Sequence, residues 1–234
     1  MIIMTDLSEV LIKGVHGMEQ LVEKRYGERV ARRFLDRRKA TNAIFCELLR
    51  GHLSEDNYWD VFLGDDKWPF EKDKLKEMLS INMIDRIPDT LSVYRRIIGY
   101  PDTVGYYMEH VMERPTFWLV SDHIAGRNLE IEYLHPEIFN LTTNQIWSFD
   151  YSLIKSDPHF FPELIATYDL LDDEVIFIDD LPINVDAARH AGITGILFEN
   201  ANQLETDLRE LGFLFADTVE EADRLNSYNE KSMI

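Results

Sequence analysis

The fold of this chain is decided by one stretch, Val175-Ile176-Phe177-Ile178-Asp179-Asp180-Leu181-Pro182-Ile183-Asn184. Its first four residues are apolar and β-branched or aromatic, which is typical of a short buried strand. Two adjacent carboxylates follow at once, and Pro182 suits the first turn of a helix. We therefore predict a strand that delivers acids to its carboxyl end just before a helix, where open α/β sheets commonly bind ligands.

An acid pair alone carries little information in this chain, because 43 of its 234 residues are Asp or Glu. Other adjacent pairs, such as Asp65-Asp66 and Glu220-Glu221, have the pattern of solvated loops or helix ends. Asp179 and Asp180 differ because an apolar strand precedes them. Two carboxylates held side by side repel each other unless a proton or a cation intervenes, and oxygen ligands favour Mg2+. The alternative is that the pair caps the following helix and faces water.

Composition narrows the class of protein. The formal net charge of −19 argues against nucleic acid or an anionic membrane as a partner, since both are polyanions. The single cysteine, Cys46, is incompatible with an internal disulfide framework and fits a reducing compartment. No apolar run approaches the roughly 20 residues that span a bilayer, and Met1 to Met4 are too short for a signal peptide. We expect a cytoplasmic protein, either a monomer or a homodimer.

The order of elements predicts two parts. A second short apolar run, Ile2 to Met4, leads to Asp6. Residues 15–99 are charged and helical in pattern, with no convincing strand. The expected helices there include one over 18–26, a longer one from Phe34 to Gly51, and one that Ser54 caps. From residue 100, strands and helices alternate, with strands expected at 116–120, 146–149 and 195–198 and helices at 103–113, 127–134, 160–170 and 203–211.

Alternation of this kind implies right-handed crossovers and a parallel sheet. We predict an α/β fold, a Rossmann-like core formed by residues 1–14 and 100–234. Residues 15–99 form an α-helical domain inserted after the first strand.

Polar side chains follow four of the expected strands: Asp6, Ser121, Lys155 and the Asp179-Asp180 pair. In a parallel sheet these strand ends lie along one edge, so we expect the side chains to converge there. In this order the chain resembles the haloacid dehalogenase-like (HAD) superfamily of hydrolases, in the branch with a helical cap inserted after the first motif. The matching stretches are residues 4–12, 118–122, 152–158, 177–188 and 192–196.

The resemblance implies a role for each matching residue. Asp6 would be the nucleophile that attacks phosphorus to give an aspartyl-phosphate. Ser121 would hold a phosphate oxygen, Lys155 would neutralise charge, and Asp122 would join them in binding substrate. The ligands of Mg2+ would be the side chains of Asp6, Asp179 and Asp180 together with the backbone carbonyl of Ser8. Phosphoryl transfer depends on positioning and charge neutralisation, which is what this set supplies.

Each residue also has a plainer interpretation. Lys155 has the pattern of a surface lysine before a helix, Ser121 that of a helix cap, and Asp6 that of a turn residue. Their joint occurrence in the order of the family favours the functional interpretation.

The chain departs from the family at Ser8, where phosphatases of this kind most often carry an aspartate as general acid and base. A serine hydroxyl does not do this near neutral pH, and such assistance is typically worth about 10²–10⁴-fold in rate. Glu9 places a further negative charge where the family commonly has a small residue. The first motif therefore puts turnover and the choice of leaving group in question.

The leading expectation is a Mg2+-dependent hydrolase of a small phosphomonoester, with a small phosphorylated metabolite as its partner. One alternative is a fold-retaining binding or regulatory protein that has lost turnover. A haloacid dehalogenase is disfavoured, because that chemistry needs no metal and leaves the Asp179-Asp180 pair without a purpose. A basic cluster at residues 32–39 is expected to be a solvated helix face, with recognition of an anionic substrate as the alternative. The seven histidines lack the paired spacing of a zinc site.

Overall fold

The computed structural model describes residues 1–14, 17–99, 114–170 and 175–232. Its centre is a parallel sheet of five strands in the order β4-β3-β1-β5-β6. The strands are β1 (Ile2–Thr5), β3 (Thr116–Ser121), β4 (Thr142–Trp147), β5 (Val175–Asp179) and β6 (Thr194–Leu197). The predicted α/β fold with a parallel sheet is confirmed. The helix expected at 103–113 lies outside the described residues.

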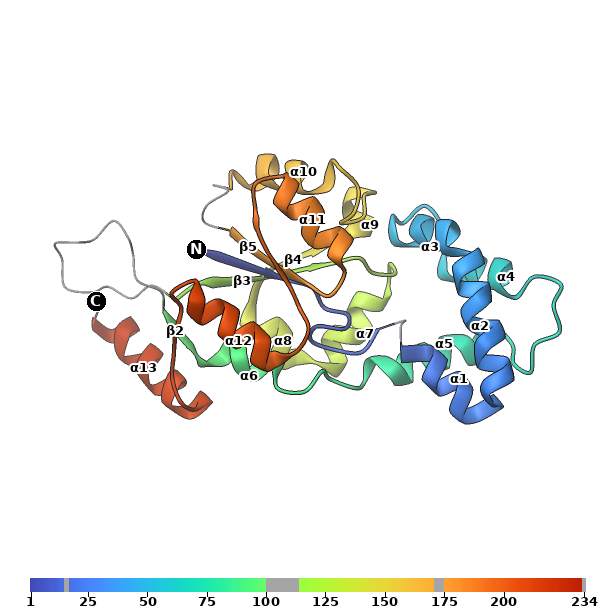
Figure 1. The fold of residues 1–234 in the computed structure, drawn as a ribbon, viewed down its shortest axis with the longest axis horizontal. Coiled ribbons are helices and arrows are strands. Elements are labelled where there is room, and N and C mark those ends of the chain that lie inside the picture. Colours follow the sequence, from blue (N-terminus) through green and yellow to red (C-terminus); the bar gives the residue numbers. More distant parts are fainter. Residues whose placement is uncertain (15–16, 100–113, 171–174, 233–234) are drawn as a thin grey trace.

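The sheet is buried on both faces, which explains why β1 and β5 are continuous apolar runs rather than alternating ones. Met4 and Phe177 are register partners and pack on one face. That face is covered by α10 (Phe160–Tyr168) and α11 (Pro182–His190). Figure 1 shows these two helices on one side of the sheet, with α6 (Thr90–Arg96), α8 (Pro136–Leu141) and α12 (Ala201–Glu210) on the other.

Five of the described helices in the inserted segment lie to one end of the sheet (Figure 1). They are α1 (Met18–Tyr26), α2 (Glu28–Ala40), α3 (Asn42–Leu49), α4 (Glu55–Leu63) and α5 (Lys72–Met83). The segment expected to form one helix from Phe34 to Gly51 instead belongs to two helices, α2 and α3, because the helix is interrupted at Thr41. The Thr41 hydroxyl donates a hydrogen bond to the Arg37 carbonyl, and such local side-chain bonding competes with continuation of the helix. The Ser54 cap is confirmed, since its hydroxyl accepts the Asn57 N–H at 3.2 Å.

The division of the chain at residues 15 and 99 stays a prediction. The structure adds that α6 and the short strand β2 (Ile97–Gly99) lie against the core elements. α6 contacts α12 and α13 (Val219–Ser232), and β2 pairs antiparallel with β7 (Leu214–Phe215). A strand therefore exists in a segment where the sequence pattern indicated none.

The remaining core elements are α7 (Arg127–Leu134), as expected, and α9 (Ser148–Tyr151). β4 begins at Thr142 rather than at Ile146. It is an edge strand, and its first half is the polar run Thr142 to Gln145, so apolar patterning marked only its buried end. Within the described ranges, no helix is both long and apolar enough to cross a membrane.

Candidate active site

The acidic side chains meet at the carboxyl edge of the sheet. β1 and β5 are neighbours, so Asp6, which follows β1, lies beside Asp179, which ends β5. Carboxylate oxygens of Asp6, Asp179 and Asp180 lie within 4.8 Å of one another. The convergence predicted from the strand ends is therefore present in the structure, although the role of each residue stays a prediction.

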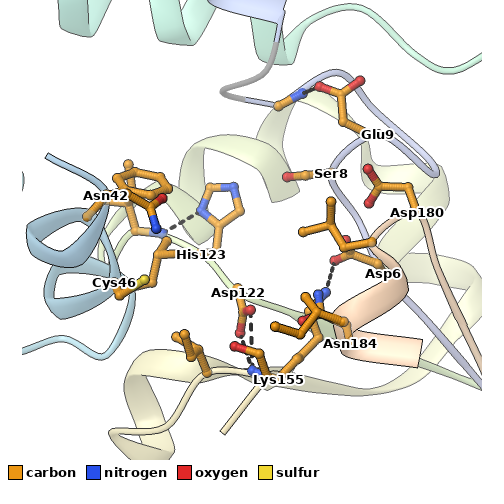
Figure 2. A pocket seen from close by; sticks show the side chains of 18 of the residues that line it. Asp6, Ser8, Glu9, Asn42, Cys46, Asp122, His123, Lys155, Asp180 and Asn184 are labelled. Atoms are coloured by element: carbon orange, nitrogen blue, oxygen red, sulfur yellow. Dashed lines mark hydrogen bonds and ion pairs between the residues drawn. The ribbon is translucent and has the colours of Figure 1, made fainter. Parts of the chain in front are cut away.

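Lys155 is the cation of this cluster. Its side chain comes from the loop between α9 and α10 and is 1% exposed. The Nζ atom lies 2.7 Å from Asp6 Oδ1 and 2.6 Å from Asp179 Oδ2 (Figure 2). Burial by itself lowers the pKa of this ammonium, but the two carboxylates outweigh it and raise the pKa above the ordinary value for lysine. Lys155 is thus a charged group at neutral pH, and the surface interpretation of this residue is wrong.

Asp6 is held in place from both sides. Its backbone N–H donates to the Ile178 carbonyl at 2.9 Å, and its Oδ1 accepts the Leu7 N–H at 2.7 Å. Burial raises the pKa of Asp6 well above the ordinary value, while Lys155 works in the opposite direction. The carboxylate is therefore costly to ionise, and its charge depends on the neighbouring ammonium.

Asp179 and Asp180 have different surroundings. Asp179 is fully buried and accepts hydrogen bonds from the Leu181 N–H at 2.8 Å and from Asn184 Nδ2 at 3.1 and 3.2 Å. Asp180 extends toward the open space beside the cluster (Figure 2), and burial together with Asp179 raises its pKa to about 6. Asn184 was assigned no role from the sequence. Its position one turn into α11, five residues after Asp179, is the signal that could have found it.

Ser121 and Asp122 stand at the end of β3. Ser121 is fully buried, and its hydroxyl has no hydrogen-bond partner in the described part of the chain. An orphaned buried hydroxyl is unusual and indicates a missing partner. Asp122 accepts the Lys155 backbone N–H at 3.0 and 3.3 Å, so it positions the loop that carries the lysine. Burial raises the pKa of Asp122 to about 6.

Glu9, the acidic residue that departs from the family pattern, has a structural role in the turn after Asp6. This residue has a left-handed backbone with φ of 63°, and its N–H donates to the Ile12 carbonyl at 2.7 Å. Its carboxylate accepts the Gly14 N–H at 3.0 Å and so closes the loop rather than joining the acidic cluster (Figure 2). Ser8 faces the open space, and Gly14 packs so closely on it that an added Cβ would lie 2.7 Å from the Ser8 Cβ.

A cavity of about 310 Å³ lies between the acidic cluster and the helices of the inserted segment. Its lining includes Asp6, Ser8, Asp122, Lys155 and Asp180 on the polar side. The opposite side is mostly apolar and comes from α3 and α5. His123, which the sequence did not single out, also lines the cavity; burial lowers its pKa to about 4.

Several contacts hold these helices against the core. Arg50 donates to both Asp157 oxygens, at 3.0 and 2.7 Å, and Ser148 Oγ donates to the Leu49 carbonyl at 2.6 Å. On the other side, Arg127 of α7 donates to Glu55 of α4 at 2.9 and 2.7 Å. The cavity is therefore covered by the inserted segment.

The basic cluster at residues 32–39 mainly holds the inserted segment together. Arg37 donates to the Phe62 and Val61 carbonyls, and Arg33 lies over the Trp68 ring at 4.1 Å. Arg38 lines the cavity, and its guanidinium donates to Glu19 at 2.8 Å. Neither the solvated-face interpretation nor the anion-recognition alternative describes the whole cluster.

Comparison with solved structures identifies the class of fold. A HAD family enzyme of Bacteroides thetaiotaomicron, solved as a magnesium complex, matches with a TM-score of 0.62 and 13% identity over 88% of this chain and 97% of that one. A predicted HAD-like family hydrolase of Porphyromonas gingivalis matches with a TM-score of 0.60 and 19% identity, covering 90% and 97%. The L-2-haloacid dehalogenase of Xanthobacter autotrophicus matches with a TM-score of 0.57 and 13% identity, covering 89% and 82%. The chain has the HAD-like fold, as the motifs of its sequence predicted.

One curated protein adds a similarity in sequence. The chloroplastic flavin mononucleotide hydrolase 1 of Arabidopsis thaliana is 43% identical over 58 residues. The match spans 25% of this chain and 24% of that protein, so the two share about a quarter of their lengths. No family model matches the chain.

Proposed function

We propose that this protein is a Mg2+-dependent hydrolase of a small phosphomonoester that acts through an aspartyl-phosphate intermediate. The observation that carries the proposal is the convergence of three carboxylates and one buried lysine beside a cavity. Such a cluster is expensive to assemble, because the desolvation of each charge must be compensated. A site for a cation and an anionic substrate explains why the fold retains it.

The donor set fits Mg2+. Asp6, Asp179 and Asp180 bring oxygen atoms within 4.8 Å of one another, and hard oxygen ligands are what this ion prefers. Asp6, Asp180 and the Ser8 backbone carbonyl would hold the ion. The Asp179 oxygens already accept hydrogen bonds from Asn184 and Leu181. Asp179 would therefore contact the ion through a water molecule and would mainly orient the neighbouring ligands. When bound, the ion would neutralise negative charge on the phosphoryl group and on the carboxylates.

The protein's own residues supply the remaining chemistry. Asp6 would attack phosphorus with its free oxygen, since Oδ1 already accepts bonds from Leu7 N–H and Lys155. As the bond from Asp6 to phosphorus forms, the P–O bond of the ester breaks, and the leaving oxygen takes a proton from water to give the alcohol. A second water then attacks phosphorus, which releases inorganic phosphate and restores the Asp6 carboxylate. Lys155 would balance the charge of both nucleophile and phosphate. The unpartnered hydroxyl of Ser121 would donate to a phosphate oxygen, which would satisfy it.

The comparisons support this class of substrate. The curated relative is named for hydrolysis of flavin mononucleotide, a phosphomonoester, and one of the related folds was solved with magnesium and inorganic phosphate. A small phosphorylated metabolite is accordingly the proposed partner. The cytoplasmic location and the choice between monomer and homodimer stay predictions.

The test is phosphate release from para-nitrophenyl phosphate, with Mg2+ and with a chelator. We expect release only with Mg2+, and we expect Asp6→Asn to abolish it while the melting temperature stays within a few degrees, because the amide is isosteric but poorly nucleophilic. Turnover of Asp6→Asn at a comparable rate would remove Asp6 from the role of nucleophile. Absence of phosphate release, with Mg2+ still raising the melting temperature, would favour the binding-protein alternative. Halide release from 2-chloropropionate would favour the dehalogenase.

A further inference from the structure

The cavity beside the carboxylates has apolar walls on both sides. The inserted helices contribute Phe45 and Leu49 from α3 and Leu79 and Met83 from α5. The core contributes four apolar side chains: Ile124, Ile154, Leu181 and Ile183. A pocket with this lining and a few placed polar groups is typical of sites that bind an apolar small molecule.

Two of the apolar residues that the core contributes to the cavity lining are exposed to solvent without any evident structural reason. Ile183 is 63% exposed and Leu181 is 37% exposed, directly after the acidic pair and at the mouth of the cavity. Ile183 lies in the first turn of α11, where a polar residue would serve the helix equally well. Their exposure is explained if they contact the part of a substrate that extends beyond its phosphate.

Both permanent cations that line the cavity are already paired with carboxylates of the protein. Its lining in the described chain includes two permanent cations, Lys155 and Arg38. Lys155 pairs with Asp6 and Asp179, and Arg38 pairs with Glu19 through side chains that are 15% and 24% exposed. A second anionic group on the substrate would therefore have to displace a carboxylate of the protein, which disfavours it.

His123 is the fixed polar group among these walls. Its Nδ1 accepts the Ile124 N–H at 2.9 Å, and its ring packs edge-on against Trp147 at a centroid distance of 5.9 Å. Because Nδ1 accepts, the neutral ring carries its proton on Nε2, the nitrogen that remains for the cavity. Figure 2 shows the ring between Asn42 and Ser8 in this view of the cavity.

We propose that this cavity selects phosphomonoesters whose alcohol carries an uncharged, mostly apolar group of ring size, with His123 Nε2–H donating a hydrogen bond to it. This inference rests on the proposed phosphatase function and specifies its leaving group. Sugar phosphates are disfavoured by the apolar walls, and substrates with a second phosphate are disfavoured because both lining cations are already paired and further carboxylates line the cavity.

The first experiment compares two phosphonates, which cannot be hydrolysed, by calorimetry in the presence of Mg2+. 2-Naphthylmethylphosphonate should bind about 10- to 100-fold more tightly than methylphosphonate, as expected for burial of one large apolar group. Equal affinities would overturn the proposal. Because no turnover is needed, this result does not depend on whether the protein is a phosphatase.

A matched pair of variants locates the effect. Ile183→Ser and Leu129→Ser each remove an apolar side chain near the start of a helix, 63% and 68% exposed respectively, but Leu129 of α7 does not line the cavity. Ile183→Ser should weaken binding of the naphthyl compound about 3- to 10-fold and leave methylphosphonate unchanged, which removal of part of one apolar contact predicts. Leu129→Ser should change neither. Equal effects of the two variants would place the apolar contact elsewhere and overturn the assignment.

Turnover separates the two proposals. 2-Naphthylmethyl phosphate and ethyl phosphate are both esters of aliphatic alcohols, so a difference in their rates reports recognition rather than leaving-group acidity. A higher kcat/KM for the naphthyl ester, reduced in His123→Phe through KM more than through kcat, supports the pocket. If both esters are hydrolysed equally well, the pocket proposal fails and the phosphatase stands. If only the naphthyl phosphonate binds tightly and neither ester is cleaved, the pocket stands and the phosphatase fails.

Discussion

Replacement of Lys155 by methionine removes the cation that lies between two buried carboxylates while keeping a side chain of similar length. In the wild type, the ammonium is 2.7 Å from Asp6 and 2.6 Å from Asp179, and it is 1% exposed. After the replacement, two carboxylates remain at close range with no compensating charge. Metal-free protein at neutral pH should therefore lose much of its stability.

The size of the loss follows from this geometry. Removing one partner of a buried ion pair typically costs about 3–5 kcal/mol, because the remaining charge stays buried. In a chain of this length about 1 kcal/mol changes the melting temperature by about 2–4 °C, so a decrease of about 6–20 °C is expected. The pKa of Asp6 is already raised by burial, so its ionisation destabilises the fold as pH increases. The loss should accordingly be smaller in acid than at pH 7.

The assay is thermal and urea unfolding in a chelator and in millimolar Mg2+. Mg2+ should restore part of the stability of Lys155→Met, since it supplies a cation to the same oxygens. Adding Asp179→Asn to Lys155→Met should also restore stability, by about 0.5–3 kcal/mol, because it removes one of the repelling charges. Lys24→Met on the exposed surface of α1 is the control, and it should change stability by no more than about 0.5 kcal/mol.

Two outcomes would refute this account. If Lys155→Met melts within the range of the Lys24→Met control in metal-free buffer, Lys155 does not compensate buried charge. If the Asp179→Asn addition lowers stability further, hydrogen bonding rather than charge repulsion dominates the cluster.

Two other substitutions test the site. The folded-state pKa of Asp122 is raised to about 6, so its contribution to stability is present below about pH 4 and is lost as the pH rises through 6. Asp122→Asn should therefore gain stability relative to wild type between pH 4 and 7, by up to about 3 kcal/mol. Urea unfolding of both proteins across that pH range measures this difference in stability. A difference that does not vary with pH would contradict the assignment. Ser8→Asp supplies the carboxyl that the first motif lacks, and should raise the ethyl-to-phenyl phosphate rate ratio by up to about 10²–10⁴-fold, since alkyl leaving groups need protonation most. An unchanged ratio at equal Mg2+ would mean that another group already donates the proton; crowding by Gly14 would instead show as lost stability.

The sequence alone was sufficient to locate the structural features that follow from a local pattern of residues. The apolar runs before Asp6 and Asp179 are strands because their side chains pack on both faces of a parallel sheet, and such strands read as continuous apolar stretches. Alternation of these runs with helical segments then requires that the acids meet at one edge. The fold class and the meeting of these acids at one edge of the sheet were therefore predictable.

Residues that depend on packing could not be found in this way. The pattern of strand ends placed Lys155 near the acids, but only the structure shows that it is fully buried and contacts two carboxylates. Thr41 divides one expected helix through a hydroxyl bond to Arg37, which helical periodicity does not register. Glu9, which the sequence suggested as a disturbing charge, closes its own loop by bonding to Gly14.

The cavity itself was decided by tertiary structure alone. Its apolar walls come from α3, α5 and α11, and long-range contacts such as Arg50–Asp157 bring these helices together. His123 faces the cavity because the Ile124 amide and the Trp147 ring fix its orientation. A strand delivers its terminal residues to a known edge of the sheet, but nothing in local sequence states which side chains will lie opposite them. The sequence thus determined where the acidic side chains lie, and the packing of distant segments determined which side chains line the cavity beside them.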